Sequence, residues 1–239
     1  MAAREKSILT QHARGLWSWA TRHPEWHPGD FGAEVVSFAA RGKGGALLLL
    51  DPQLPEGGER DEVLALLDRQ AALKSTKAIS IQVSLGYHAR STEELWDRYR
   101  KEDVPVTVHG HDAVRKRLRK RVYKDFTEIE AGVEMPGGVV PYRIGKPKRQ
   151  ETPLWIPSHS AILFGDAIVG AEGGARAWAH NPIDEKVTAF YTERFNPTVE
   201  PLLELGAERL LMTHGPSVMK NGTRVLRKGL AAGPWYRPG

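Results

Sequence analysis

The alternation of apolar and polar residues divides the N-terminal part of the chain into short predicted elements. Segments 34–40 and 46–50 are mostly apolar and flank a glycine-rich turn at 41–45, which predicts two strands joined by that turn. The second segment is apolar at every position, so we expect its strand to be buried on both faces. Residues 1–33 keep neither a helical nor a strand period, and we expect an irregular lead-in there.

Helical and strand patterns alternate in the next part of the chain. Apolar residues recur on one helical face over 60–73, which predicts a helix, and an apolar strand follows over 79–85. Ser91 and Glu94 have the spacing of a capping box, so we expect another helix to begin there. Two further predicted elements are a strand over 104–108 and a helix capped by Asp112, with the apolar stripe Val114, Leu118 and Val122.

The C-terminal half combines short β-like pieces with helices. Residues 132–153 are rich in Gly and Pro and predict a meander that includes 139–144. The other predicted elements are strands over 154–156, 161–164 and 209–213, a helix that starts at Asn196 and ends at Gly206, and a helix over 222–231. This order of elements indicates one α/β domain with a mixed sheet or two sheets.

Composition narrows the class of protein. The chain has 239 residues, 41% of them hydrophobic and 26% charged, and a chain of this mass buries about 70% of its extended surface. It has no Cys, which excludes disulfides, thiol catalysis, thiolate zinc sites and iron–sulfur clusters. The sequence has neither an apolar run of membrane-spanning length nor a signal-peptide core, so we expect a cytoplasmic protein without a membrane partner. The net charge of +5 weakly favours an anionic ligand.

Four polar residues stand where predicted strands end, namely Asp51, His88, Asp166 and His214. Loops at strand ends project from a rigid sheet and often carry functional groups in α/β folds. Imidazole and carboxylate together are the ligands that a divalent metal takes where thiolate is absent. The alternative is that each of these residues caps a turn or makes a structural hydrogen bond.

Three short segments around these residues resemble motifs of the metallo-β-lactamase superfamily, in matching order and spacing. They are Leu48-Leu49-Leu50-Asp51-Pro52, Ile162-Leu163-Phe164-Gly165-Asp166-Ala167 and Leu211-Met212-Thr213-His214-Gly215-Pro216. The resemblance implies an α/β fold of α+β type, an αββα sandwich of two mixed β-sheets flanked by helices. We therefore expect a single domain of this kind over 34–239, preceded by the lead-in 1–33.

The family's central motif, His-x-His-x-Asp-His, follows the strand that corresponds to 79–85 and supplies most ligands of a one- or two-metal hydrolytic site. This chain has Ser-Leu-Gly-Tyr-His-Ala-Arg-Ser at 84–91, with a single His. Two registers are open. One places Leu85, Tyr87, Ala89 and Arg90 on the four ligand positions and His88 on a spacer. The other, shifted by two, places His88 on the last His and Tyr87 on the Asp.

The family's middle ligand, a His in a Gly-His-Thr-type loop, also has no counterpart. His109 and His111 precede a predicted helix, and the stretch 146–152 contains no His. The resemblance therefore assigns Asp166 as the metal-bridging Asp and His214 as the final His, with His88 as a third ligand in the shifted register. A two-metal site needs about five or six protein ligands, and a catalytic one-metal site about three.

Three functions follow from this ligand count. The leading prediction is an atypical or inactive homologue without a cofactor, which binds a small anionic molecule through Tyr87, His88, Arg90 and Asp51. The alternative is a metal-dependent hydrolase of an ester, thioester or phosphoester. It would hold one zinc or iron ion on His88, Asp166 and His214, with Asp166 and His214 as the catalytic pair. Arg90 could equally pair with Asp166 or Glu94.

The third prediction is nucleic-acid binding through a basic helix over 113–124. Residues 115–124, from Arg115 to Lys124, contain seven cations and no acid, a density that attracts phosphates. The alternative without a function is a solvated helix face, because the acids that follow directly at Asp125, Glu128 and Glu130 would neutralise part of the positive charge.

The aromatic lead-in carries Trp17, Trp19 and Trp26, which would either pack on a sheet edge or cover a pocket. His23 and His27 are four residues apart, but each is followed by a proline, which disfavours the helix that would make them a ligand pair. The sequence specifies no oligomeric state.

Overall fold

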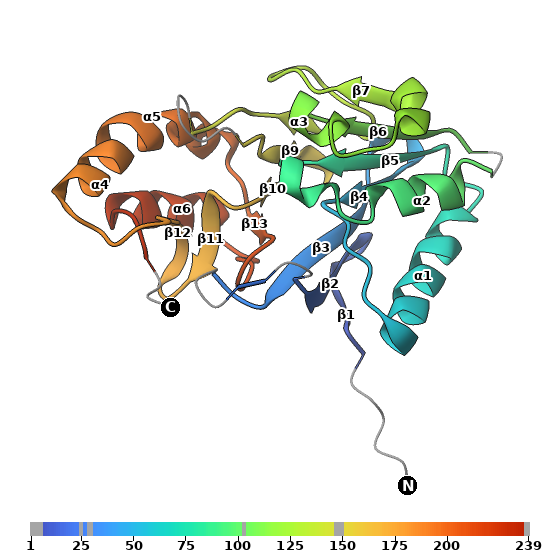
Figure 1. Ribbon diagram of the computed structural model, residues 1–239, viewed down its shortest axis with the longest axis horizontal. Coiled ribbons are helices and arrows are strands. Elements are labelled where there is room, and N and C mark those ends of the chain that lie inside the picture. The colour runs from blue at the N-terminus through green and yellow to red at the C-terminus, as the bar shows by residue number, and fades with distance from the viewer. Residues whose placement is uncertain (1–6, 24–25, 28–30, 102–103, 146–150, 237–239) are drawn as a thin grey trace, which may run out of the picture.

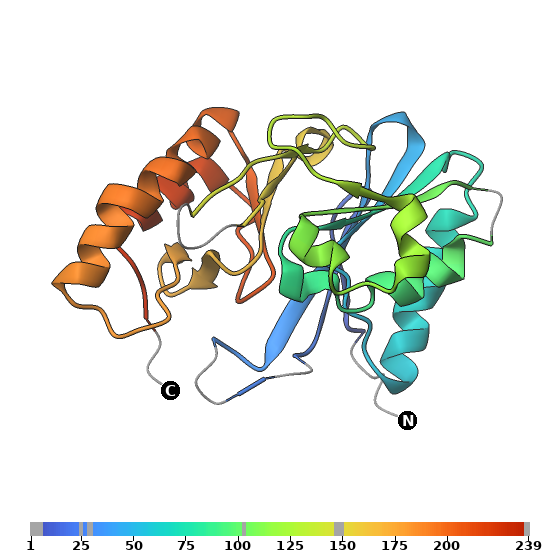
Figure 2. The same cartoon turned by 45° about the horizontal axis from the view of Figure 1, so that its top comes forward.

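Two β-sheets pack face to face, and helices cover the outer side of each sheet in the computed structural model of the protein (Figure 1). The structure describes residues 7–23, 26–27, 31–101, 104–145 and 151–236. Figure 2 shows α4 to α6 on one outer side and α1 to α3 on the other. This is the predicted αββα sandwich.

The first sheet has seven strands in sequence order. They are β1 (Leu9–Ala13), β2 (Leu16–Arg22), β3 (Glu34–Arg41), β4 (Ala46–Leu50), β5 (Ala78–Val83), β6 (Val106–Gly110) and β7 (Phe126–Glu128). The pairs from β1 to β4 are antiparallel, and those from β4 to β7 are parallel. Because β4 and β5 run in the same direction, their carboxyl ends meet at one edge of the sheet.

The second sheet has the order β13-β10-β9-β8, and a separate two-stranded sheet pairs β11 with β12. The strands are β8 (Val140–Pro141), β9 (Leu154–Ile156), β10 (Ala161–Phe164), β11 (Ile168–Ala171), β12 (Gly174–Ala177) and β13 (Arg209–Met212). Strands β10 and β13 are parallel, whereas β9 pairs antiparallel with both β8 and β10. The carboxyl ends of β10 and β13 thus also share an edge.

The helices are short apart from α1 and α6. Their bounds are α1 (Gly57–Ala71), α2 (Thr92–Tyr99), α3 (Asp112–Arg115), α4 (Glu185–Phe190), α5 (Asn196–Val199) and α6 (Gly222–Ala231). No helix of the described residues combines the length and apolarity that crossing a membrane requires.

Strand β4 lies at the centre of the hydrophobic core, because its side chains alternate between two apolar layers. Leu47 and Leu49 pack with α1 and α2, whereas Leu48 and Leu50 pack between the two sheets, and all four are fully buried. The prediction of a strand buried on both faces is confirmed. Asp51 follows directly from this strand, at the edge of the sheet where β4 and β5 end.

The prediction of an irregular lead-in over 1–33 is wrong for much of its length. Strands β1 and β2 form a hairpin around Gly15, which has a φ of +78°, and β2 pairs with β3. Trp19 is fully buried and its Nε1 donates a hydrogen bond to Gln53 O, so it packs in the core. In β2, Leu16 packs between the two sheets, whereas Trp17 and Trp19 pack in the layer with α1 and α2, so this strand does not alternate between core and surface.

Two predicted helix starts are also corrected. Ser91 is the N-cap of α2, but its hydroxyl accepts a hydrogen bond from Leu54 N instead of capping the helix, and Glu94 pairs with Arg60. At the next helix the cap is His111 instead of Asp112, because His111 Nδ1 accepts from Ala113 N. Tertiary partners compete successfully with the local capping pattern in the first case.

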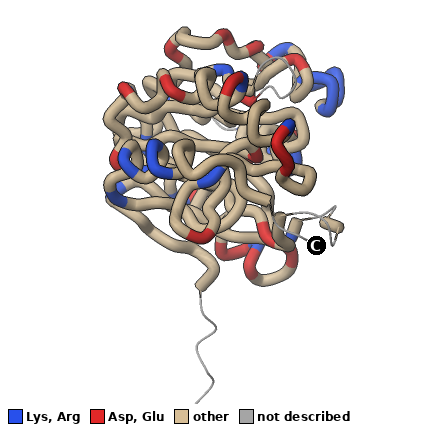
Figure 3. Tube along the Cα trace, turned by 90° about the vertical axis from the view of Figure 1, so that its left-hand side faces the viewer, with Lys and Arg blue, Asp and Glu red and all other residues tan. Residues whose placement is uncertain are grey.

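The basic helix over 113–124 is broken into two short pieces. Helix α3 ends at Arg115, and a 3-10 turn follows over Lys120–Asp125. Val114, Leu118 and Val122 are nevertheless buried as the stripe predicted. Much of the charge is paired: Lys116 with Asp112, Arg119 with Glu93, and Arg121 with Glu93 and Asp97. On the α4–α6 side, Figure 3 shows basic and acidic positions together.

The C-terminal helical run begins earlier than predicted. Asp184 caps α4 by accepting a hydrogen bond from Val187 N, and the chain stays helical through α5 to Gly206, where a left-handed residue ends it as expected. Asn196 therefore lies inside the run. Strands β7, β11 and β12 have only three or four residues each, too few for a pattern in the sequence to predict them.

A buried histidine in β6 makes the fold sensitive to acid. Burial lowers the pKa of His109 to about 4, so between that value and the ordinary value near 6.5 only the unfolded chain takes up the proton. We expect stability to fall by about 3 kcal/mol as the pH drops through this range, and His109→Gln to remove this part of the loss. Urea unfolding at about pH 7.5 and about pH 4.5 measures the difference; equal acid losses in both proteins would contradict it.

Candidate functional site

The ends of four strands bring the predicted polar residues together. Asp51 follows β4, and His88 lies in the 3-10 turn Gly86–Ala89 after β5. Asp166 follows β10, and His214 follows β13. Since each pair of strands is parallel, one sheet contributes Asp51 and His88, and the other contributes Asp166 and His214.

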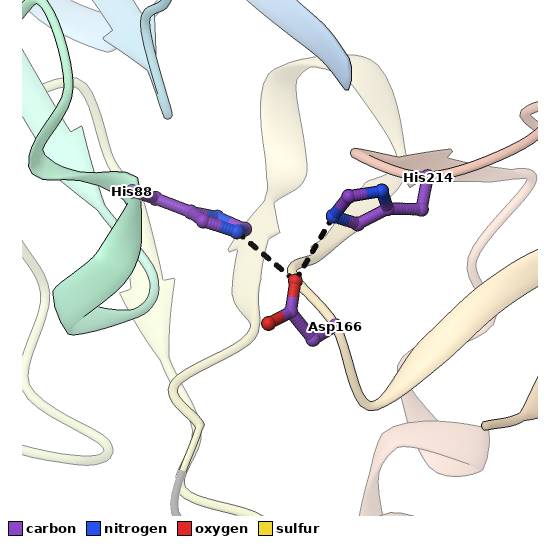
Figure 4. Close-up of side chains that lie close together, drawn as sticks. All are labelled: His88, Asp166 and His214. Atoms are coloured by element: carbon purple, nitrogen blue, oxygen red, sulfur yellow. Dashed lines mark hydrogen bonds and ion pairs between the residues drawn. The ribbon is translucent and has the colours of Figure 1, made fainter. Parts of the chain in front are cut away.

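His88, Asp166 and His214 converge on one point (Figure 4). Asp166 Oδ1 lies 3.0 Å from His88 Nε2 and 3.1 Å from His214 Nε2. The two imidazoles are nearly buried, whereas the Asp166 side chain keeps 21% of its surface exposed. Asp166 is therefore the most accessible member of this triad.

Asp51 does not face the triad's shared point but holds His88 from behind. Its Oδ2 lies 2.9 Å from His88 Nδ1, and its carboxylate also accepts hydrogen bonds from the Ser84 amide (2.7 Å) and hydroxyl (2.5 Å). Asp51 is fully buried. This arrangement fixes the ring of His88 so that Nε2 points at Asp166, which is how carboxylates orient metal-binding histidines.

The charges of the site are strongly coupled. Burial and the Arg90 cation lower the pKa of His88, but Asp51 and Asp166 outweigh them and raise it to about 9. Burial favours the neutral form of Asp166, yet His88 and His214 hold its pKa well below the ordinary value. Below about pH 9, His88 therefore donates from both ring nitrogens to two carboxylates.

Glu151 is a site residue that sequence reasoning missed. Its buried carboxylate accepts hydrogen bonds from the amides of Gly165 (2.8 Å), Asp166 (2.8 Å) and Ala167 (2.7 Å). It lies at the end of the stretch 146–152, in which the resemblance led us to look for a His ligand. In the sequence, Glu151 is a single Glu before Thr152, Pro153 and a predicted strand. This pattern is too common to identify a site residue.

The loop that carries His214 packs tightly on β11. His214 O accepts a hydrogen bond of 2.9 Å from Gly170 N, and a Cβ at Gly170 would lie 2.1 Å from Pro216 O. We expect Gly170→Ala to lower the free energy of unfolding by about 1–3 kcal/mol, because backbone must move to admit the methyl group. Chemical denaturation checks this, with Gly58→Ala as the control, since a Cβ there meets nothing within 4 Å. Equal stability of the two variants would contradict the expectation.

A cavity of about 630 Å³ opens in front of the triad. Tyr87 and Arg90, both predicted binding residues, line it together with Arg117 from the basic segment. Tyr87 is 66% exposed, and the centroid of its ring lies 4.5 Å from Cζ of Arg117. His23, His27 and Phe31 of the predicted lead-in also line this cavity, so part of that segment borders the site.

His88 joins Asp166 and His214 as a third donor, which is the arrangement that the shifted register predicts. Tyr87 does not join them. Neither do the two other histidines that the sequence analysis weighed: His109 is buried in β6 and bonded to Thr107, and His111 caps α3.

The triad is a group of side chains that could hold a metal ion. Its three donor atoms lie within 4.8 Å of one another, and no second such group of His, Cys, Asp and Glu occurs among the residues that the structure describes. Bonds of roughly 2.1 Å to a shared ion place tetrahedral donors about 3.4 Å apart, slightly more than the hydrogen-bond spacings here. Two imidazoles and one carboxylate suit zinc or iron.

Comparison with solved structures gives many similar folds. The structure of a β-lactamase domain protein from Burkholderia ambifaria is 12% identical, with 97% of this chain and 78% of that protein aligned and a TM-score of 0.58. The metallo-β-lactamase from Pontibacter korlensis is 13% identical over 93% of this chain and 98% of its own, with a TM-score of 0.57. The chemotaxis sensor ODP, solved as a peroxy diiron species, is 13% identical. The alignment covers 94% of this chain and 93% of the sensor, with a TM-score of 0.53.

Sequence comparison adds nothing to this, since no family model and no curated protein matches the chain. The structural similarities extend over nearly the whole chain and agree with the two mixed sheets between helices. The protein therefore has the metallo-β-lactamase fold.

Proposed function

We propose that the protein holds one divalent metal ion, zinc or iron, on His88, Asp166 and His214, and hydrolyses an ester, thioester or phosphoester of a small anionic compound. The observation that carries this proposal is the convergence of three donors, with Asp51 fixing the ring of His88 from behind. A structural hydrogen bond between Asp166 and the histidines would not require that support.

Two residues beside the triad, Glu151 and Tyr87, favour a site with one ion instead of two. The carboxylate of Glu151, beside the triad, accepts hydrogen bonds from three backbone amides. Tyr87, which takes the Asp position in the shifted register, has an exposed side chain under Arg117. Neither is arranged as a ligand of a second ion.

Each residue has a distinct part in this function. When bound, a divalent ion supplies Lewis acidity and lowers the pKa of coordinated water. Asp166 is the most accessible member of the triad and can orient the reacting group from the cavity floor. Arg117 and Arg90 supply positive charge at the cavity wall, which suits a carboxylate or phosphate on the substrate. The diiron centre of the similar chemotaxis sensor supports metal binding in this fold.

A panel of p-nitrophenyl esters, thioesters and phosphoesters tests the proposal in protein loaded with zinc, manganese or iron. We expect hydrolysis of one class that a chelator abolishes, that metal restores and that His214→Ala removes. The control is His12→Ala, since His12 lies on β1 and bonds to Ser18. A wild type that is inert with every metal would overturn the hydrolase.

The second candidate is a metal-free homologue that binds a small anionic molecule. It is favoured by the hydrogen bonds of the triad, because both imidazoles already have a carboxylate partner without an ion. This candidate requires anion binding in chelator-treated protein that Arg117→Gln weakens. Absence of such binding would remove it.

A further inference from the structure

A second cavity adjoins the one in front of the triad. It has a volume of about 690 Å³ and lies against α4. Tyr87, Asp166 and His180 line both cavities. Asp166 thus borders both cavities, which together we call the groove.

The two halves of this groove differ in chemistry. The first half contains the cations Arg90 and Arg117. The second half is walled by aliphatic and aromatic side chains, namely Leu85, Ala179, Val187, Phe190 and Tyr191, with the exposed Asn181 and Lys186 as its other polar groups beside the shared residues. The hydroxyl of Tyr191 donates to Trp178 O, which ties this apolar wall to the wall of the first half.

Charge is available to a ligand in the first half of the groove. Arg117 is stacked on Tyr87 and has no carboxylate partner within the described part of the chain. Glu93, the acid that lines the same half, is already paired with Arg119 and Arg121. An anion would therefore meet an uncompensated guanidinium that the Tyr87 ring holds in place.

We infer that the ligand of this groove is an amphipathic anion, with its carboxylate or phosphate at Arg117 and an apolar chain against Val187 and Phe190. The inference deepens the proposed function and rests on it, because it takes Asp166 as the reacting position between the two ends. A compact anion would leave the apolar half filled with water, whereas a chain of several methylenes would bury that surface.

Binding of n-alkylphosphonates tests this inference, because their carbon–phosphorus bond resists hydrolysis. Calorimetry would compare methyl-, butyl-, hexyl- and octylphosphonate. We expect the affinity to rise about two- to fourfold for each added methylene. An affinity that does not depend on chain length would overturn the inference.

Variants separate the two ends of the ligand. We expect Val187→Asp to abolish the chain-length dependence and leave methylphosphonate binding unchanged, whereas Val133→Asp, at a 51% exposed site outside the groove, keeps both. Arg117→Gln should weaken every phosphonate about tenfold without changing the dependence. A dependence that survives Val187→Asp would contradict the inference. Metal content and hydrolysis test the proposed function separately, so a failure of the inference is distinguished from a failure of that function.

Discussion

Asp166→Asn is expected to lower the affinity for zinc or iron by at least about 100-fold, because it removes the only carboxylate of the triad. Loss of a residue that merely supports a ligand costs 10- to 100-fold in metal affinity, so loss of a ligand should cost more. Asp166 Oδ1 is the atom on which both imidazoles converge. With an amide there, two neutral donors remain to hold a dication.

Isothermal titration with zinc measures this loss, and circular dichroism verifies that the variant is folded. Asp61→Asn, on an exposed position of α1, is the matched control and should bind metal like the wild type. If Asp166→Asn kept its metal affinity within about threefold of the wild type, the triad would not be the metal site.

Asp51→Asn should have the largest effect on stability. The variant presents an amide N–H₂ either to the protonated Nδ1 of His88 and the Ser84 hydroxyl, which share Oδ2 of the wild-type carboxylate, or to the Ser84 backbone N–H, which contacts Oδ1. Breaking a buried ion pair on one side costs about 3–5 kcal/mol. The same change should weaken metal binding about 10- to 100-fold, because His88 loses its support.

The stability loss in Asp51→Asn depends on pH with a defined sign. The pKa of His88 is raised to about 9 in the folded protein, so the stability linked to its proton is complete below about pH 6.5 and disappears as the pH rises through 9. The deficit of the metal-free variant should therefore be largest near pH 6 and smaller at about pH 9.5. Urea unfolding in chelator at both values measures it; a deficit that grows with pH would be contrary to this assignment.

Hydrophobic patterning was a sufficient guide to the central strands. Leu47 to Leu50 are apolar at every position because they face two apolar layers, and no other element fits that pattern at this length. The hairpin of β1 and β2 was missed because both faces of β2 are covered: Trp17 and Trp19 pack in the layer with α1 and α2, and Leu16 packs between the sheets. The strand therefore lacks a simple alternation of buried and exposed positions. The Ser91 cap was lost to a partner 37 residues away, a contact that local spacing does not contain.

The sequence predicted those site residues that directly follow a strand. Asp51, His88, Asp166 and His214 each follow a strand, and the parallel pairing of β4 with β5 and of β10 with β13 brings them together. The register of His88 could not be chosen from the sequence, because a single His does not fix the alignment to a motif that has three. Only the fold places its Nε2 beside Asp166.

Metal content of the purified, tag-free protein tests the central claim most directly. Elemental analysis without added metal should find about one zinc or iron ion per chain in the wild type, and below about one-tenth of an ion in Asp166→Asn. A wild type with less than about one-tenth of an ion per chain, which also takes up none on titration with zinc or iron, would contradict the one-metal site and leave the metal-free anion-binding function.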